Sequence, residues 1–291
     1  MVEHLTADVI TSRDNKWLKT FRAVLRGVGP REDDPLGVEG LKLVEDALGS
    51  GLEAVAVLVS ESGERELEHI LRAASESEAG VSRSRVLRTT DKLFESVART
   101  ETPQGVAALF RQPAWEFDAI LRGIPMAGAG FDQSPPLIVV MTGVQDPGNI
   151  GTIVRSAEAF GATGAVTTRG SADPWSPKAL RASAGSALRL PLLRGLAVPV
   201  LLAQLRVARV RIVAASSHSG DPAIEQNGVD ESLRDSVAVF IGNEGAGLPS
   251  EVEHAADARM TIPIAGAVES LNAGIAASIV LYEAARQRKG F

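Results

Sequence analysis

Two runs of five consecutive apolar residues, Leu137–Met141 and Val237–Ile241, constrain the fold more than any other feature of the sequence. A strand that is apolar on both sides has no face suited to water, and such strands are typical of parallel sheets covered by helices on both faces. Helical patterns separate these runs from further short strands, which we expect at residues 165–168, 188–193, 211–215 and 259–264. The alternation predicts an α/β domain with a mostly parallel sheet.

A smaller α/β unit is predicted before this domain. Strands are expected at residues 54–59, 85–88 and 106–110, and helices at 40–48, 64–74 and 91–99. Between Gly123 and Pro136 the chain is rich in glycine, alanine and proline without periodicity, which is typical of a linker. We therefore expect a first domain at residues 1–112, a linker at 113–136 and a second domain at 137–291, in keeping with a length of 291 residues.

The composition excludes several kinds of site. The chain has no cysteine, which removes disulfides, thiolate zinc sites and thiol nucleophiles. Its four histidines show no metal-ligand spacing, so no metal site is expected. The N-terminus has no signal-peptide pattern, and the longest apolar segment, Ile275–Tyr282, is far too short to cross a membrane. We therefore expect a cytoplasmic protein without a membrane partner.

A formal net charge of −6 does not favour RNA binding by the chain as a whole, so an RNA partner would need a local basic patch. One candidate lies in the amphipathic helix predicted over residues 13–26, where Lys19, Arg22 and Arg26 share a face opposite to an apolar one. Two interpretations are open: a solvated helix face, or a stripe that contacts phosphates.

Three polar loops follow three apolar strands, at Gly143–Arg155, Gly242–Leu248 and Gly266–Asn272. Because parallel strands present their carboxyl ends at one edge of the sheet, we expect these loops to converge into one pocket. The second loop is neither a Walker loop nor a dinucleotide fingerprint. Its glycines are interpreted as letting the backbone approach a ligand, with Asn243 and Glu244 as hydrogen-bonding groups.

The first loop is predicted to enter a helix that runs to Phe160. Asn149 is a candidate for its N-cap, and Gly151 would keep its first turn bare. Arg155 lies near the positive end of this helix dipole, a position that disfavours a cation unless an anion binds there. We therefore treat Arg155 as a candidate anion-binding residue.

The C-terminal segment begins with a short strand expected to end at Pro263. A helix follows, with its start marked by Glu269, Ser270 and Asn272. From Ala273 to Tyr282 nearly every residue is apolar or small, which predicts a buried helix, partly against a partner chain. Ser270 has no neighbouring histidine, which argues against a serine hydrolase.

The three loops resemble the sequence motifs of the SpoU/TrmH family of RNA ribose 2′-O-methyltransferases. Asn149, Gly151 and Arg155 match the first motif, Asn-x-Gly-x-x-x-Arg. Gly242–Leu248 matches the second, Gly-Asn-Glu-Gly-x-Gly-Leu, without a gap. Thr261–Asn272 is similar to the third, with Ile264 where many members have methionine. The similarity covers residues 137–288, and residues 13–112 resemble the ribosomal-protein-like substrate-binding domain of many members.

The resemblance implies a catalytic domain with a deep C-terminal trefoil knot that binds S-adenosylmethionine. The implied cofactor-binding residues are Gly242, Asn243, Glu244, Gly245, Ile262 and Leu271. The implied catalytic residues are Arg155, Asn149, Ser270 and Asn272. A homodimer through the C-terminal domain is also implied. Since the pKa of arginine is too high for a resting base, we expect Arg155 to stabilise the developing 2′-alkoxide and to bind the adjacent phosphate.

The resulting hypothesis is an S-adenosylmethionine-dependent RNA 2′-O-methyltransferase, with large-subunit rRNA favoured because of the separate N-terminal domain. The absence of cysteine agrees with it, since pyrimidine C5 methylation generally runs through a cysteine adduct and ribose methylation does not. Alternatives are a tRNA 2′-O-methyltransferase, an antibiotic-resistance enzyme acting on the same RNA, a non-catalytic RNA-binding or ribosome-assembly protein, and a generic nucleotide-binding enzyme.

Overall fold

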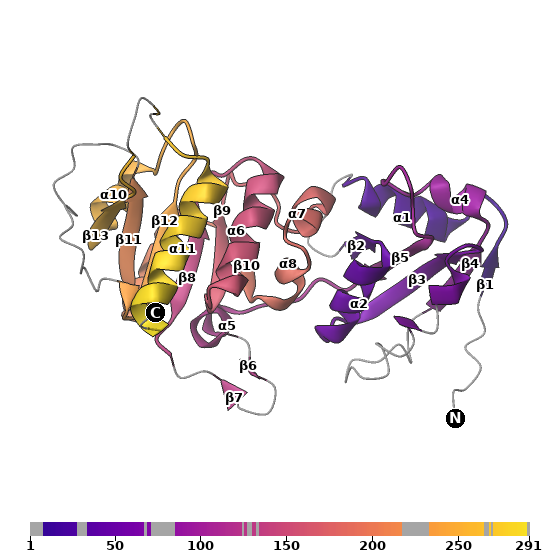
Figure 1. Ribbon diagram of the computed structural model, residues 1–291, viewed down its shortest axis with the longest axis horizontal. Helices are drawn as coiled ribbons and strands as arrows, with labels where there is room; N and C mark the ends of the chain where they lie inside the picture. The colour runs from indigo at the N-terminus through magenta and orange to yellow at the C-terminus, as the bar shows by residue number, and fades with distance from the viewer. Residues whose placement is uncertain are drawn as a thin grey trace. The chain divides into compact units, whose positions relative to one another are not determined.

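A computed structural model of the chain (Figure 1) describes residues 8–27, 34–66, 69–70, 85–123, 125–126, 130–131, 134–216, 233–264, 268 and 270–289. The structural statements below concern these residues. The chain divides into two compact units, each with its own sheet and core. The first comprises Met1–Ala114 with Trp175–Pro177, and the second comprises Trp115–Pro174 with Lys178–Phe291.

The first unit contains a five-stranded sheet in the order β1-β4-β3-β5-β2. Strand β4 is parallel to β1 and β3, whereas β5 is antiparallel to β3 and β2. Its strands are β1 (Asp8–Ile10), β2 (Leu36–Glu39), β3 (Ala54–Ser60), β4 (Arg85–Thr89) and β5 (Val106–Phe110). Its helices are α1 (Lys16–Leu25), α2 (Leu41–Gly49), the 3₁₀ turn η1 (Glu64–Glu66) and α4 (Asp91–Glu95).

Helix α1 is amphipathic, as the sequence predicts. The Asn15 side chain caps it by accepting a hydrogen bond from the Trp17 N–H at 2.8 Å. Leu18, Phe21 and Leu25 are buried in the core of this unit, which includes side chains from β3, β4 and β5. Most of the helix predicted at residues 64–74 lies outside the described residues, and the described part begins with the 3₁₀ turn.

The second unit is built on a six-stranded, entirely parallel sheet in the order β10-β9-β8-β12-β11-β13. Its central pair, β8 (Leu137–Met141) and β12 (Val237–Ile241), places Val139 opposite Val239. All five residues of each strand are buried. The remaining strands are β9 (Gly164–Thr168), β10 (Leu192–Leu196), β11 (Arg211–Ser216) and β13 (Ala258–Thr261), and a short hairpin joins β6 (Pro125–Met126) to β7 (Gly130–Phe131). The predicted α/β fold with a parallel sheet is confirmed.

Helices cover both faces of this sheet (Figure 1). One face packs against α5 (Phe117–Arg122), α9 (Val198–Val207) and α10 (Ser250–Ala255), with Phe240 and Ile138 among the shared core residues. The other face carries α6 (Pro147–Ala159) and α11 (Ala273–Lys289), which lie side by side, while α7 (Pro177–Ala182) and α8 (Ser186–Arg189) are two short helices near α6. Ser156 of α6 and Ser278 of α11 share a hydrogen bond of 2.7 Å between their hydroxyls.

Two segments differ from the sequence-based expectation. Residues predicted as linker contain helix α5, whose Ile120 is completely buried and whose carbonyl accepts a hydrogen bond from Thr163 at 2.7 Å. The prediction of a strand at residues 188–193 was wrong at its start, because residues 188 and 189 belong to helix α8. Arg189 there is held to Glu158 of α6 by two hydrogen bonds, and β10 begins only after Pro191.

Arg288 anchors the end of α11 to the rest of the second unit. Its guanidinium donates hydrogen bonds to the carbonyls of Leu233, Pro135, Pro136 and Asp235. Burial lowers the pKa of Arg288 to about 10, so the group stays charged at neutral pH. The four carbonyls lie just before β8 and β12, so a single side chain ties the final helix to the two central strands.

We expect Arg288→Ala to lower the free energy of unfolding by about 2–4 kcal/mol, because several partly buried carbonyls lose their donor together. Arg286→Ala, two residues earlier on the same helix, is the matched control. Arg286 pairs with Glu283 near the surface, where such pairs contribute about 0–1 kcal/mol. Urea denaturation of both variants measures the difference, and equal losses would contradict the role of Arg288.

Candidate active site

The loops that follow β8, β12 and β13 meet at the carboxyl edge of the second sheet, as expected for parallel strands. The second and third loops line a pocket, together with Ala215 at the end of β11. The first loop does not line it, but its Gly143 carbonyl accepts a hydrogen bond from Asn243 at 3.1 Å. The three loops are therefore joined, with the pocket on the side of β11 and β13.

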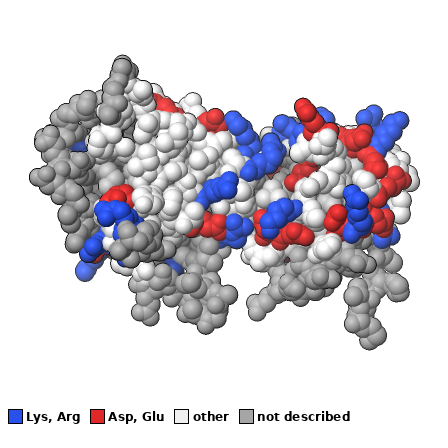
Figure 2. All heavy atoms as spheres, viewed as in Figure 1, with Lys and Arg blue, Asp and Glu red and all other residues white. Residues whose placement is uncertain are grey.

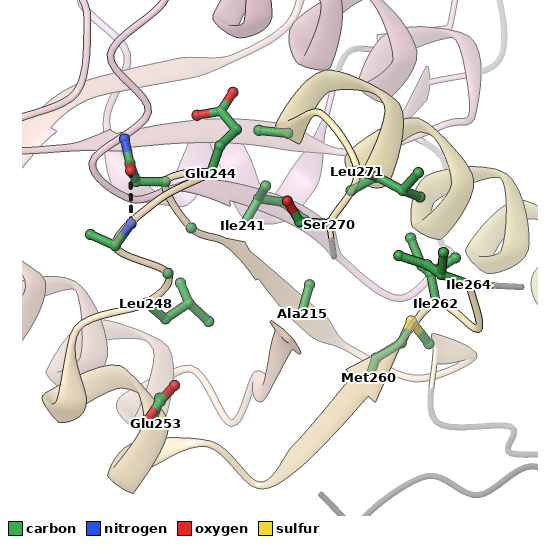
Figure 3. Close-up of a pocket in the computed structure, with 16 residues that line it drawn as sticks. Ala215, Ile241, Glu244, Leu248, Glu253, Met260, Ile262, Ile264, Ser270 and Leu271 are labelled. Atoms are coloured by element: carbon green, nitrogen blue, oxygen red, sulfur yellow. Dashed lines mark hydrogen bonds between the residues drawn. The ribbon is translucent and has the colours of Figure 1, made fainter. Parts of the chain in front are cut away.

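The pocket combines an apolar wall with a few polar groups. About 800 Å³ of space, including solvent at its mouth, lies among these side chains. Met260, Ile262 and Ile264 lie together on one side, and Leu248 and Glu253 on the other (Figure 3). The lining also includes Glu244, Ser270 and Leu271, and none of the described residues that form it is a lysine or arginine. Such a mixture of apolar walls and few polar groups is typical of small-molecule sites.

The glycines of the second loop have a more local cause than close approach of a ligand. A Cβ on Gly242 would lie 2.5 Å from the carbonyl carbon of Gly247, so only glycine fits where the loop folds back on itself. Asn243 holds the same turn, because its Oδ1 accepts from the N–H groups of Gly245 and Ala246 at 2.9 and 3.0 Å. Thus Asn243 and Gly242 shape the loop, although both also border the pocket.

Asn149 connects all three loops. Its side-chain N–H donates to the Glu244 carboxylate, and its Oδ1 accepts from Asn272 at 3.0 Å. Asn272 in turn caps α11, accepting from the N–H groups of Gly274 and Ile275. The prediction that Asn272 marks the start of this helix is confirmed, whereas Glu269 lies outside the described residues.

The prediction that Asn149 caps α6 was wrong, because the helix begins at Pro147, two residues before Asn149. Asp146 is the N-cap, accepting from the Gly148 N–H at 2.6 Å, and Pro147 occupies the first turn. Hydrogen bonding from Lys178, and then from the Gly148 backbone, holds the pKa of Asp146 below its usual value. With the cap supplied by Asp146, the Asn149 side chain is released to bridge the loops.

Arg155 lies two turns into α6 with an exposed side chain. No described residue pairs with its guanidinium, and it does not line the pocket. Gly151, one turn earlier, is where α7 crosses: a Cβ there would lie 2.4 Å from the Ala179 carbonyl oxygen. The first turn of α6 is bare at Gly151, as predicted, and the space is filled by α7.

The C-terminal motif contributes to both the pocket and the loop junction. Ser270, Leu271 and Ile262, which the sequence predicts to be catalytic or cofactor-binding residues, line the pocket, and Asn272 joins Asn149. The strand before them ends at Thr261 and not at Pro263. Helix α11 is not wholly buried in this chain, because Ile275, Ile279 and Tyr282 are 53%, 40% and 49% exposed.

Sequence reasoning missed Glu253, Met260 and Ala215 in the pocket lining. Met260 lies in β13 and Ala215 in β11, and both segments were predicted as strands without a functional signal. Glu253 lies in the short helix α10, where a single carboxylate looks like an ordinary solvated residue. Only the three-dimensional arrangement identifies these residues.

The basic stripe of the first unit consists of Lys19, Arg22 and Arg26, and these residues differ in their contacts. Arg22 donates two hydrogen bonds to Ser96, at 3.3 and 3.2 Å, while Lys19 pairs with Asp14 at 3.1 Å. Arg26 is exposed at the end of α1. Within the described ranges there is no cluster of three metal-ligating side chains, and no helix there is long and apolar enough to span a membrane.

Comparison with known proteins identifies the family. Residues 136–282 match the model of the SpoU rRNA Methylase family, and residues 31–108 match the MRM3-like substrate binding domain. The chain belongs to the SpoU rRNA methylase family. The resemblance found in the three motifs is therefore confirmed.

Relatives of this SpoU family member are similar over most of their length. A 23S rRNA (guanosine(2553)-2′-O)-methyltransferase, RlmP, of Bacillus subtilis is 30% identical over 94% of this chain and 97% of the relative. An uncharacterized tRNA/rRNA methyltransferase of Mycobacterium leprae is 33% identical over 89% and 80%. The AdoMet-bound rRNA methyltransferase of Sinorhizobium meliloti has a TM-score of 0.78 and 30% identity, covering 96% of this chain and 98% of that one.

We expect Asn149→Asp to destabilise this SpoU domain more than Asn149→Ala at pH 7, by about 1–2 kcal/mol, because the new carboxylate faces Glu244. The difference between the two variants should shrink below about pH 4, where carboxyl groups become protonated. Chemical denaturation at both pH values measures it.

The double variant Asn149→Asp/Glu244→Gln is the control for this charge repulsion and should recover most of the lost stability at pH 7. A pH-independent difference would show that Glu244 is not the group that opposes the new charge.

Proposed function

We propose that this chain transfers the methyl group of S-adenosylmethionine to the ribose 2′-hydroxyl of a nucleotide in large-subunit rRNA. The observation that carries the proposal is the junction of Asn149, Glu244 and Asn272 beside a largely apolar pocket, with the unpaired Arg155 on the same helix as Asn149. Membership of the SpoU family and similarity to a B. subtilis enzyme named for 23S rRNA 2′-O-methylation support it.

The pocket suits S-adenosylmethionine. Leu248, Met260, Ile262, Ile264 and Leu271 supply apolar contacts of the kind that an adenine ring and a thioether stem require. The carboxylates of Glu244 and Glu253 and the absence of lining lysine or arginine favour a ligand that carries positive charge. When bound, the cofactor supplies an already activated methyl group, so that positioning becomes the main task of the protein.

Arg155 serves the acceptor side of the reaction. A ribose 2′-hydroxyl is a poor acid, and arginine holds its proton too tightly to act as a resting base. Its fork of N–H donors can bind the phosphate beside the target ribose and stabilise negative charge as it develops on the 2′-oxygen. Asn149, two turns before Arg155 on α6 and fixed by Glu244 and Asn272, orients this part of the site. Ser270, in the pocket lining, would contact the methyl donor or the ribose.

We further propose that residues 137–291 form a deep trefoil knot. Strand β13 pairs with β11 and not with β12, and the chain then returns to pack α11 against α6. The similarity to SpoU methyltransferase structures supports this topology. Gly242, Gly245, Ile262 and Leu271 would then hold the cofactor through backbone groups of the crossing loops.

The domain at residues 1–112, followed by a connecting segment at 113–136, would bind the RNA substrate. The match of residues 31–108 to a substrate-binding domain supports this role. Arg26 is the more available member of the basic stripe, because the Arg22 guanidinium is engaged by Ser96 and Lys19 pairs with Asp14. Action on ribosomal RNA would place the protein in the cytoplasm.

The exposed side of α11 favours a homodimer. Ile275, Ile279 and Tyr282 recur at helical spacing on one stripe, and Tyr282 contacts Phe160 of α6 edge to face at 5.7 Å. A stripe of exposed large apolar side chains is typical of a protein interface. A second copy of the chain would cover it through the C-terminal domain.

Ile279→Glu is expected to convert the dimer into a monomer, because the new charge would be buried without a partner in the interface. Sedimentation at several protein concentrations measures the mass. Val207→Glu, an equivalent change at a residue that is 86% exposed on α9, is the control and should leave the mass unchanged. A monomeric parent protein would contradict the dimer.

Arg155→Ala is expected to lower methyl transfer by about 10²–10³-fold, as for loss of a donor that acts in the transition state. Affinity for S-adenosylmethionine should stay unchanged, since Arg155 does not line the pocket. The assay follows labelled methyl groups into unmodified rRNA and tRNA and maps alkali-resistant linkages.

Label in one rRNA nucleotide that the variant loses would establish the reaction and the substrate. Label in tRNA alone would show that the same reaction takes place on tRNA and not on rRNA. Full turnover by the variant at saturating substrates would contradict the role of Arg155, and absence of cofactor binding would favour a non-catalytic RNA-binding protein.

A further inference from the structure

The segment between β8 and α9 has a charge balance unlike that of the whole chain. Residues 142–197 carry six lysines and arginines against three acids, although the formal net charge of the protein is −6. A local excess of this kind has to be explained by the structure, because like charges on one surface repel one another.

Each of the three acids has a basic partner inside the same segment. Lys178 pairs with Asp146 at 2.7 Å, Arg189 with Glu158 at 2.6 Å, and Arg194 with Asp173 at 3.7 Å. The Arg189 fork lowers the pKa of Glu158, so this pair is ionised at neutral pH. The remaining three arginines, Arg155, Arg169 and Arg181, are exposed, and no side chain within the described ranges neutralises them.

The three arginines occupy neighbouring elements beside the loop junction. Arg169 directly follows β9, and the loop after β9 is joined to the first loop because Ser171 accepts a hydrogen bond from the Gly143 N–H at 2.9 Å. Arg181 lies on α7, which crosses α6 at Gly151, one turn before Arg155. Figure 2 shows Lys and Arg side chains gathered over the surface of α6 and α7.

Close packing and an ion pair join α7 to α6. Lys178 and Asp146 clamp α7 to the start of α6, and a Cβ on Gly151 would clash with Ala182 at 2.5 Å. Arg181 is thus displayed from a fixed helix and Arg169 from a short turn after a buried strand. A fixed display lowers the entropy lost when a ligand binds.

The carboxyl edge of the sheet is therefore divided by charge. Among the described residues, the lining of the pocket beyond β12 has two carboxylates and no cation, whereas the loops and helices around β8 and β9 leave three guanidinium groups unpaired. Guanidinium groups bind phosphate through paired N–H donors, and an RNA strand supplies a row of phosphates. An RNA backbone fits the unpaired side of this edge.

We propose that Arg169 and Arg181 are positioning residues that bind phosphates flanking the target nucleotide, extending the contact made by Arg155. This inference rests on the proposed function, since it takes Arg155 as the residue at the acceptor ribose. Arg169 and Arg181 act on the RNA backbone and not on the methyl donor. They contribute to RNA affinity and register but not to the chemical step.

The test compares Arg169→Gln, Arg181→Gln and the double variant with the parent protein. Binding of in vitro transcribed large-subunit rRNA is measured from about 50 to 300 mM salt, since each lost phosphate contact should reduce the slope of log K against log salt by about one. Each single change should raise the KM for rRNA about fivefold while kcat at saturating RNA stays within about twofold. Affinity for S-adenosylmethionine should not change.

Two further variants separate a phosphate contact from a general loss of charge or structure. Arg209→Gln removes an exposed, unpaired arginine that precedes β11, at the amino edge of the same sheet, and should leave rRNA binding unchanged. Arg181→Lys retains a cation and should restore most of the salt slope. If Arg181 had a merely structural role, Arg181→Lys would not restore the salt slope.

The outcomes are distinct. Suppose that the parent protein methylates RNA, but the double variant has the parent's KM for rRNA and salt slope, or changes them no more than Arg209→Gln does. The inference is then overturned and the proposed function stands. If the variants lose salt slope but the parent transfers no methyl group, the phosphate contacts stand and the proposed function fails. Absence of RNA binding by the parent overturns both.

Discussion

The pairing of β8 with β12 is the contact on which the second unit depends. These strands lie about a hundred residues apart in the chain, yet every residue of both is buried and they run in parallel register through Val139 and Val239. Because both faces must be covered, α6 and α11 are required on one side and α5, α9 and α10 on the other. Parallel strands then deliver their following loops to a single edge, where Asn149, Glu244 and Asn272 meet.

That edge has two regions of opposite electrostatic character. The pocket beyond β12 combines apolar walls with carboxylates, which suits a cationic methyl donor, while the region around α6 and α7 keeps three arginines unpaired. Asn149 lies where the two regions join. Its hydrogen bonds join α6, the helix that also carries Arg155, to the loops that border the pocket.

Much of the fold could be predicted, and several residues predicted for the site lie at the pocket or at the loop junction. The structural reasons for individual residues often could not be predicted. The apolar runs identified β8 and β12 to the residue, and Ser270, Leu271 and Ile262 do line the pocket. Gly242, in contrast, was interpreted as letting the backbone approach a ligand, and Gly151 as keeping the first turn of its helix bare, whereas each is required by close approach of another backbone segment of the same chain. Helix α5 was missed because its six residues, set beside a glycine- and proline-rich stretch, carry too little periodicity.

The sequence by itself was sufficient for the class of fold, the family and the order of the three loops, because continuous apolar strands and the residues of contiguous motifs are local properties of the chain. Tertiary structure was needed for the partners: that Asp146 caps α6 and so frees Asn149, that Glu253 and Met260 border the pocket, and that Arg169 and Arg181 are left without an acid. Hydrogen bonds and ion pairs join residues tens of positions apart, and no local pattern records which donor lies beside which acceptor.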